Sequence, residues 1–311
     1  MRAGRRRFVW LLAVVLALVA GVVAGAKVLP EPIGSGVRAD NDYLRGRIDA
    51  LTEENKALSE KIALTDQFDA LVSGRVVRDA LAGKSVMLFR TPDAEDADVE
   101  AVAELVGRSG GSISGTIGLA NEFVDGNSAE KLYTVVNSPI VPEGRQLNPS
   151  LTDPSAQAGD LVGIALLINR APEIAPATDE ARYAVLTALG DTGFLKYGSP
   201  VGPADTAVIV TGGGLADDAG NQGLSVARFA SAMAPHGSGV VLAGRAGSAT
   251  GVAALAVART DPDLGRAVTT VDDIGSEAGR ITTVLALQSL IAGAPPGRYG
   301  TGDGADAVTV Q

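Results

Sequence analysis

Short, continuously apolar segments alternate with amphipathic helical segments along residues 83–293. The predicted strands are Lys84–Arg90, Ser112–Leu119, a segment near Phe194, Ala207–Val210, Gly239–Ala243 and Ala267–Val271. The predicted helices are Asp93–Arg108, Ser128–Val136, Ala158–Asn169, Thr178–Leu189, Asn221–Met233, Thr250–Arg259 and Glu277–Leu290. Uniformly apolar strands separated by helices are typical of a parallel sheet that is buried on both faces. We therefore predict one globular α/β domain over 83–293 with a doubly wound, mostly parallel sheet, followed by a flexible tail over 294–311.

The composition excludes several classes of function. A net charge of −10 argues against nucleic-acid binding, because phosphate contacts require a basic face. The chain has no cysteine, which excludes disulfides, thiolate metal ligands and cysteine nucleophiles. It has one histidine, so a Ser-His-carboxylate triad would have to use His236. We therefore expect a protein that is not an enzyme.

A run of 19 residues without charge, Phe8–Ala26, precedes the globular region. As a helix it would span roughly 28 Å, the thickness of a bilayer core. Residues 1–7 carry four arginines, so the positive-inside rule places them in the cytoplasm and the rest of the chain outside. We predict a single-pass membrane anchor. The alternative is a cleaved signal peptide, since Ala24-Gly25-Ala26 resembles a cleavage site; both readings export the C-terminal domain.

A heptad pattern follows within residues 40–82. Its a and d positions are Leu44, Ile48, Leu51, Asn55, Leu58 and Ile62. β-Branched residues at a with leucine at d favour a parallel pair of helices, and one asparagine at a fixes their register. We predict a coiled-coil stalk with a connecting helix, and self-association to a dimer or larger oligomer. The alternative is an amphipathic helix that packs on its own domain, because so few heptads are marginal for an isolated coil.

The loop Thr211-Gly212-Gly213-Gly214 follows a predicted strand and precedes a predicted helix. Parallel sheets bind ligands at the carboxyl ends of their strands, and glycine-rich loops there can hold phosphate. Gly212, Gly213 and Gly214 are therefore candidate ligand-binding residues. The loop matches neither the dinucleotide fingerprint nor a P-loop, so a simple turn is the alternative.

Other candidate groups lie near the predicted strand and helix ends. Arg245, Asp272 and Asp273 each follow a strand and could line one crevice, or simply lie in surface loops. Met233 and His236 place a thioether three residues before the imidazole, a ligand pair that suits Cu(I). The favoured alternative is that Met233 packs in the core at a helix end.

Two local patterns have structural interpretations. Pro92 at a first helical position with Thr91 as N-cap would start the helix that follows the first strand. Gly163 and Gly251, inside helical segments, predict close packing against a neighbour.

Several separate sequence strings occur in a fixed order along the chain. They are Phe89-Arg-Thr-Pro-Asp-Ala94, Asn127-Ser-Ala-Glu-Lys-Leu132, Val135-Val-Asn-Ser-Pro139, Gly220-Asn-Gln-Gly223, Ala234-Pro-His-Gly237 and Tyr299-Gly-Thr-Gly302. With the hydrophobic run and the heptads, they make the whole chain resemble the actinobacterial copper transport protein B family, the mycobacterial outer-membrane copper transporter. This resemblance implies a pore-forming cell-envelope protein of copper efflux and copper resistance, with copper as the transported ion.

The resemblance supplies no catalytic residues and no established set of copper ligands. It implies residence in the outer membrane, and we expect any pore to be built by an oligomer. Two other functions fit parts of the sequence: a membrane-anchored, non-enzymatic scaffold of the cell envelope, by analogy of architecture, and a ligand-binding α/β domain that uses the strand-end glycines.

Overall fold

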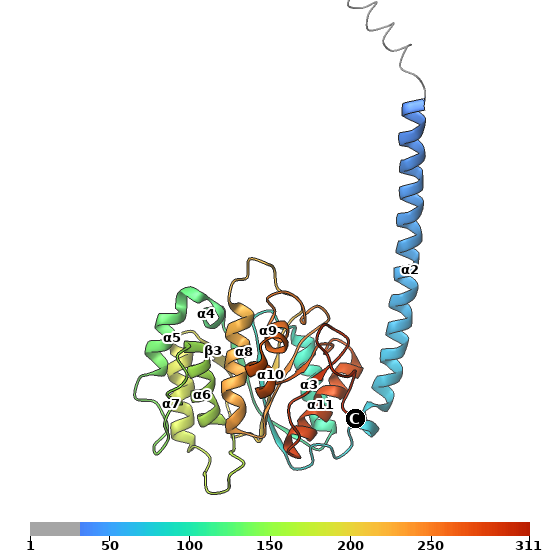
Figure 1. The fold of residues 1–311 in the computed structure, drawn as a ribbon. Coiled ribbons are helices and arrows are strands. Elements are labelled where there is room, and N and C mark those ends of the chain that lie inside the picture. Colours follow the sequence, from blue (N-terminus) through green and yellow to red (C-terminus); the bar gives the residue numbers. More distant parts are fainter. Residues whose placement is uncertain (1–31) are drawn as a thin grey trace, which may run out of the picture. The chain divides into compact units, whose positions relative to one another are not determined.

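The computed structural model describes residues 32–311 of the chain (Figure 1). The chain divides into two compact units, Met1–Leu64 and Thr65–Gln311. The predicted anchor Phe8–Ala26 and the basic segment 1–7 lie outside the described residues. Among residues 32–311, no helix has both the length and the apolar character needed to cross a bilayer.

The heptad segment lies on helix α2 (Pro32–Val76), as the pattern requires. Its a and d residues are exposed in the single chain. The second unit begins within the same helix at Thr65. There Ser73 and Val77 are buried, and Val77 joins the core of the domain. The predicted connecting helix therefore ends at Val76, and turns lead from it to the first strand.

A seven-stranded sheet forms the centre of the described domain, in the order β3-β2-β1-β4-β5-β6-β7. All neighbouring strands are parallel except β2 and β3, which are antiparallel. The strands are β1 (Ser85–Arg90), β2 (Ser112–Leu119), β3 (Leu195–Tyr197), β4 (Thr206–Val210), β5 (Val240–Ala243), β6 (Thr269–Val271) and β7 (Arg298–Tyr299). The prediction of a mostly parallel α/β sheet is confirmed.

Helices connect the strands and flank the sheet. They are α3 (Asp96–Arg108), α4 (Asn121–Val124), α5 (Ala129–Val136), α6 (Pro154–Leu166), α7 (Asp179–Asp191), α8 (Gln222–Met233), α9 (Ala254–Thr260), α10 (Pro262–Ala267) and α11 (Glu277–Ile291). Two 3₁₀ turns, η1 (Gly126–Ser128) and η2 (Ala234–His236), adjoin α5 and α8.

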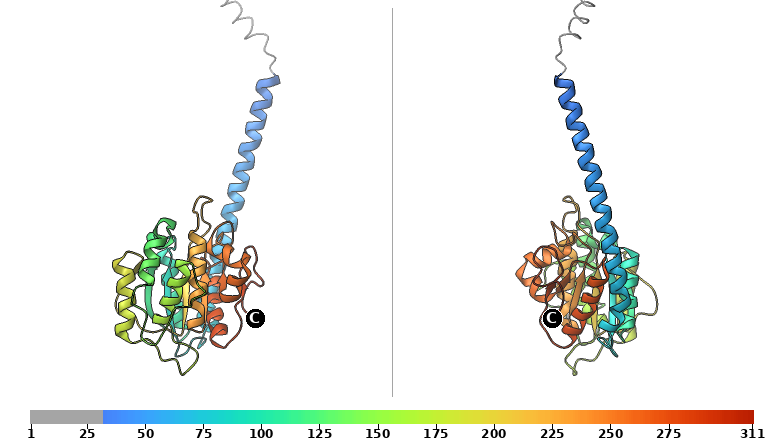
Figure 2. Two further views of the ribbon diagram at one scale, coloured as in Figure 1. Left: turned by 60° about the vertical axis from the view of Figure 1, so that its left-hand side comes forward. Right: turned by 90° about the vertical axis from the view of Figure 1, so that its right-hand side faces the viewer.

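Both faces of the sheet are buried, which explains why its strands are apolar throughout. Along β1, Met87 and Phe89 join one core, which also contains side chains of α5, α6, α7, α8 and α9. Val86 and Leu88 point the other way, into a core shared with α3 and α11. Figure 2 shows the helices of the two layers from two further directions. The sheet is therefore doubly wound. The strands β1 and β4 are neighbours, and the chain passes from β1 into α3 on one face and from β4 into α8 on the opposite face.

The starts of α3 and α6 differ from the sequence prediction. Helix α3 begins at Asp96, so Pro92 is not its first residue and Thr91 is not its N-cap. Thr91 Oγ1 donates instead to the Asp93 carboxylate. Helix α6 starts at Pro154, four residues before the predicted start, because the Asp153 carboxylate accepts from the amides of Ser155 and Ala156.

The segment predicted as a flexible tail is packed against the domain. β7 pairs with β6, and Asp272 accepts hydrogen bonds from the amides of Thr301 (2.9 Å) and Gly302 (3.0 Å). Arg259, whose side chain is 2% exposed, binds Asp272 at 2.6 Å and donates to the carbonyl of Tyr299. A buried ion pair from earlier in the chain therefore holds residues 298–302, which composition alone does not reveal.

Candidate functional site

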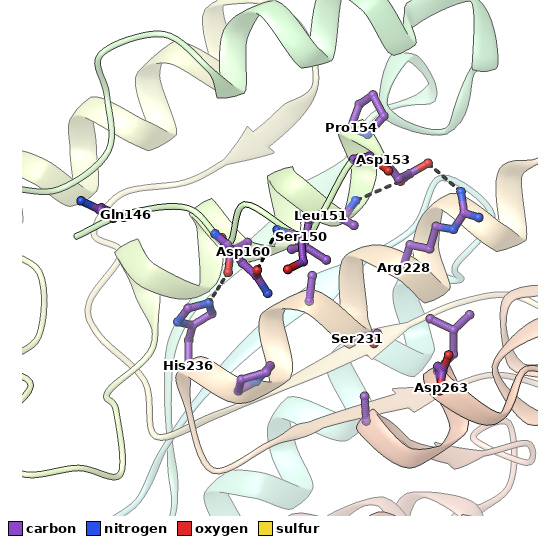
Figure 3. A pocket seen from close by; sticks show the side chains of 17 residues that line it. Gln146, Ser150, Leu151, Asp153, Pro154, Asp160, Arg228, Ser231, His236 and Asp263 are labelled. Carbon is purple, nitrogen blue, oxygen red and sulfur yellow. Dashed lines mark hydrogen bonds and ion pairs between the residues drawn. The ribbon is translucent and has the colours of Figure 1, made fainter.

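A groove of about 900 Å³ lies on the α6 and α8 side of the domain (Figure 3). The loop before α6 contributes Asn148, Ser150 and Thr152 to its lining, and α8 contributes Arg228 and Ser231. Hydroxyl and amide side chains thus share its walls with apolar side chains. A concave site of this size with a few converging polar groups is where a ligand is first sought.

Asp160 and His236 meet in this groove. Asp160 projects from α6, and η2 places His236 just beyond the end of α8, so that Asp160 Oδ1 lies 2.7 Å from His236 Nε2 (Figure 3). The other carboxylate oxygen accepts from the backbone amide of Asn148 at 2.7 Å. The Asp160 side chain is only 6% exposed, so two hydrogen bonds compensate for its burial.

Gly163 makes room for the imidazole. A β-carbon at this position would lie 2.6 Å from His236 Cδ2, closer than side chains approach one another. The prediction that Gly163 marks close packing is confirmed. Because Cδ2 and Nδ1 lie on opposite sides of Cγ in the ring, the Nδ1 edge of His236 faces away from α6.

Met233 does not accompany His236 into the groove. Its side chain is fully buried in the apolar core, and it does not line the groove. Met233 is the last residue of α8, and the η2 turn lies between it and His236, so the two side chains point in different directions. Within residues 32–311, no group of three or more His, Cys, Asp or Glu side chains is arranged to hold a metal ion.

The glycine loop after β4 is occupied by a carboxylate of the protein itself. Asp93 Oδ2 accepts from the amide of Gly212 at 3.0 Å and from Thr211 Oγ1 at 3.3 Å. A β-carbon on Gly212 would lie 2.5 Å from the Asp93 carbonyl oxygen. Asp93 thus takes the position that a bound anion takes at such loops.

The other two loop glycines approach a neighbouring loop. β-Carbons on Gly213 and Gly214 would lie 3.1 Å and 3.3 Å from the carbonyl oxygens of Ala246 and Gly247. A cavity of about 230 Å³ remains beside the loop, and Asn121 and Gln222 are among its lining residues. Close packing of backbones accounts for all three glycines, and ligand binding by them stays a prediction.

Arg245 has different partners from those predicted. It binds Asp98 at 2.5 Å and Glu95 at 2.6 Å, both near the start of α3. The hydrogen bond that Arg245 donates to the carboxylate of the fully buried Asp98 raises the pKa of the Arg245 guanidinium. Arg280 from α11 also reaches Asp98, at 3.3 Å. Of the two interpretations, a crevice shared by Arg245 and the two strand-end carboxylates is therefore not the arrangement in the structure.

The two strand-end carboxylates have separate roles. Asp272 pairs with Arg259, and Asp273 accepts a hydrogen bond from the Ser276 hydroxyl at 2.7 Å near the start of α11. Burial raises the pKa of the Asp273 carboxyl. Sequence analysis could not foresee these pairings, because positions on separate elements decide them.

The sequence patterns described above do not single out Asp160 or Asp98. A signal for Asp160 exists, because it is the one charged residue in the sequence of α6. A carboxylate buried inside a helix needs a partner, so such a residue marks either an ion pair or a site. Asp98 lies in an acidic first turn and carries no comparable signal.

These observations define a doubly wound α/β domain that follows a helix with exposed heptad residues. A groove beside α6 and α8 holds the chain's single histidine against a buried aspartate. The chain belongs to the family described as copper transport outer membrane protein, MctB, whose sequence profile matches residues 1–310. The resemblance inferred from the sequence strings is thereby confirmed.

Curated relatives agree with this assignment. The chain is 52% identical over 310 residues to a protein of Mycobacterium tuberculosis (strain ATCC 25618 / H37Rv) named copper transporter MctB, covering 99% of this chain and 98% of the relative. It is 49% identical over 305 residues to the copper transporter MctB of Mycobacterium leprae (strain TN), covering 96% of each.

Proposed function

We propose that this protein is a copper-efflux and copper-resistance component of the cell envelope, and that it works as an oligomer. The observation that carries the proposal is the match to the copper transport family along essentially the whole chain, with relatives of 49–52% identity named as copper transporters. Identity this high over the full length supports the same fold and the same transported ion for this chain and its relatives. Copper is the transported substrate in this proposal.

The helix α2 supports the oligomeric part of the proposal. Leu44, Ile48, Leu51, Leu58 and Ile62 are 49–62% exposed in the single chain. Pairing two parallel copies would remove this stripe from water, and burying a leucine or isoleucine side chain contributes about 1.5–3 kcal/mol. Asn55 at an a position would fix the register of the pair. A pore, as the resemblance stated above implies, would be formed by such an assembly.

The hydrophobic run Phe8–Ala26 supports attachment to a membrane. With arginines before it, a single-pass anchor would hold the C-terminal domain outside the cytoplasm. Two copies anchored in one membrane have a high effective concentration, which favours their pairing. Cleavage of this run would instead release the domain to travel to the outer membrane.

Copper tolerance of a deletion strain tests the proposed function. We expect the strain to grow poorly at copper concentrations that its parent tolerates, and a plasmid-borne copy to restore growth. Unchanged tolerance would remove the main support for a role in copper resistance.

A matched pair of substitutions tests the oligomer. Leu58→Asp places a charge at a d position, and Leu64→Asp places the same charge at an exposed leucine outside the a and d positions. Mass photometry of the detergent-purified full chain should show an oligomer for the wild type and Leu64→Asp, and a monomer for Leu58→Asp. A monomeric wild type, or equal effects of the two changes, would contradict assembly through the heptads.

A further inference from the structure

We propose that His236 binds copper through Nδ1 in the groove beside α6 and α8, and that Asp160 is the positioning residue for its imidazole. The inference rests on the proposed function, which supplies the identity of the ion. It goes further because it names the atom that contacts the ion and the residue that orients it.

The tautomer of His236 follows from its partner. An ionised carboxylate only accepts hydrogen bonds, so Nε2, at 2.7 Å from Asp160 Oδ1, carries the proton. In a neutral imidazole the other nitrogen then holds a free lone pair. Histidines that bind metals in proteins commonly donate their second N–H to a carboxylate in this way. The arrangement therefore presents Nδ1 as the binding atom.

The imidazole is held in place on two sides. Asp160 lies within α6, and its Oδ2 accepts from the amide of Asn148. The direction in which its Oδ1 meets His236 Nε2 is therefore fixed. The backbone of Gly163 lies against the Cδ2 edge of the ring. Both contacts come from α6, so the ring has little freedom to turn and its Nδ1 edge faces away from this helix. The His236 side chain remains 20% exposed and lines the groove.

The chemistry of the groove suits a labile copper site. Imidazole is a good ligand for copper, whereas this chain has no thiolate and Met233 is buried away from the groove. The groove of about 900 Å³ leaves room for water or a small carried ligand to complete the coordination. One protein ligand gives a site that releases its ion readily, as a step in transport requires.

The single histidine makes the test direct. Cu²⁺ alone is titrated into the purified full chain, and pulsed electron paramagnetic resonance detects the remote nitrogen of a coordinated imidazole. Any such signal from a chain with one histidine arises at His236. We expect the signal in the wild type at one equivalent of Cu²⁺, and a loss of both the signal and most of the affinity in His236→Gln.

Two carboxylate variants separate positioning from general charge. Asp160→Asn should keep the imidazole signal and weaken Cu²⁺ binding roughly 10–100-fold, the usual effect of losing the partner that orients a ligand. Asp263→Asn removes a carboxylate that also lines the groove but pairs only with the exposed Arg266, and it should leave the affinity unchanged. Equal weakening by both variants would reduce Asp160 to a contributor of charge.

Absence of imidazole coordination in the wild type would overturn the site. If His236→Gln does not fold, protection of His236 by Cu²⁺ from diethyl pyrocarbonate in the wild type decides instead, and no protection refutes the proposal. A deletion strain that is sensitive to copper, combined with a purified chain that shows no imidazole signal, would leave the proposed function standing and remove only this site.

Discussion

The carboxylate of Asp160 lies 2.7 Å from Nε2 of His236, although 76 positions separate the two residues in the sequence. Helix α6 makes this approach possible by supplying the carboxylate and, one turn later, a glycine against the ring. The pair connects α6 to the end of α8, and both residues line the groove of about 900 Å³. Packing between these helices therefore sets the position of the one imidazole in the chain.

Gly163→Ala tests this packing. The added methyl group would lie 2.6 Å from His236 Cδ2, so the ring must move away from α6. We expect a loss of about 1–3 kcal/mol in the free energy of unfolding, as overpacking costs in a tight interior. The histidine ring resonances should shift in the NMR spectrum. Gly107→Ala is the matched control, because this helical glycine has open space around it and alanine should add about 1 kcal/mol of stability. Unchanged ring resonances in Gly163→Ala would contradict the contact.

Asp98→Ala tests the buried ion cluster. The change leaves Arg245 and Arg280 without their shared buried carboxylate. Removing one partner of a buried ion pair costs about 3–5 kcal/mol, which urea unfolding would measure. Asp263→Ala removes an exposed pair with Arg266 and should have no measurable effect. Similar unfolding midpoints for the two variants would show that Asp98 does not organise this region.

Asp272→Ala tests the attachment of the C-terminal segment. The amides of Thr301 and Gly302 lose their acceptor, and Arg259 loses its buried partner. We expect faster hydrogen exchange over residues 298–304, with the exchange of α6 unaltered. Asp306→Ala breaks only the more exposed pair with Arg298 and should leave the two amides protected. Slow exchange in Asp272→Ala would mean that other contacts hold the segment.

Asp273→Asn tests the dependence of stability on pH. Burial raises the Asp273 pKa in the folded chain above the usual value of 3.8. At pH values between the unfolded pKa and the raised folded pKa, the folded chain therefore binds more protons than the unfolded chain. The contribution of Asp273 to the free energy of unfolding therefore falls as pH rises through this window. The asparagine variant should match the wild type below the window and be more stable above it.

Thermal unfolding at several pH values measures this difference. Asp218→Asn, on an exposed loop, controls for the change in net charge. A variant that is less stable than the wild type at neutral pH would show that the ionised Asp273 carboxylate stabilises the fold.

The sequence predicts the layers of this domain well, because apolar runs and helical periodicity report burial directly. Strand β4 is found within one residue of its predicted start. The edge strand β7 is not predicted. Its two residues are held by pairing with β6 and by the Arg259–Asp272 ion pair, and they carry no strand pattern of their own.

The sites depend on a different kind of information. The sequence singles out His236 and offers core packing of Met233 as an alternative, but the partner Asp160 does not follow from local spacing. Arg245 likewise has its partners on α3 rather than at the neighbouring strand ends. Side-chain partners across separate elements are fixed by tertiary packing, which one sequence does not display.

The intracellular copper content of a deletion strain is the most direct measurement of the proposed function. Parent, deletion and complemented strains would be grown at one sub-inhibitory copper concentration, and their copper determined by mass spectrometry relative to zinc as an internal reference. We predict more copper in the deletion strain, parental copper in the complemented strain, and equal zinc in all three. Equal copper in all three strains would contradict a role in copper efflux.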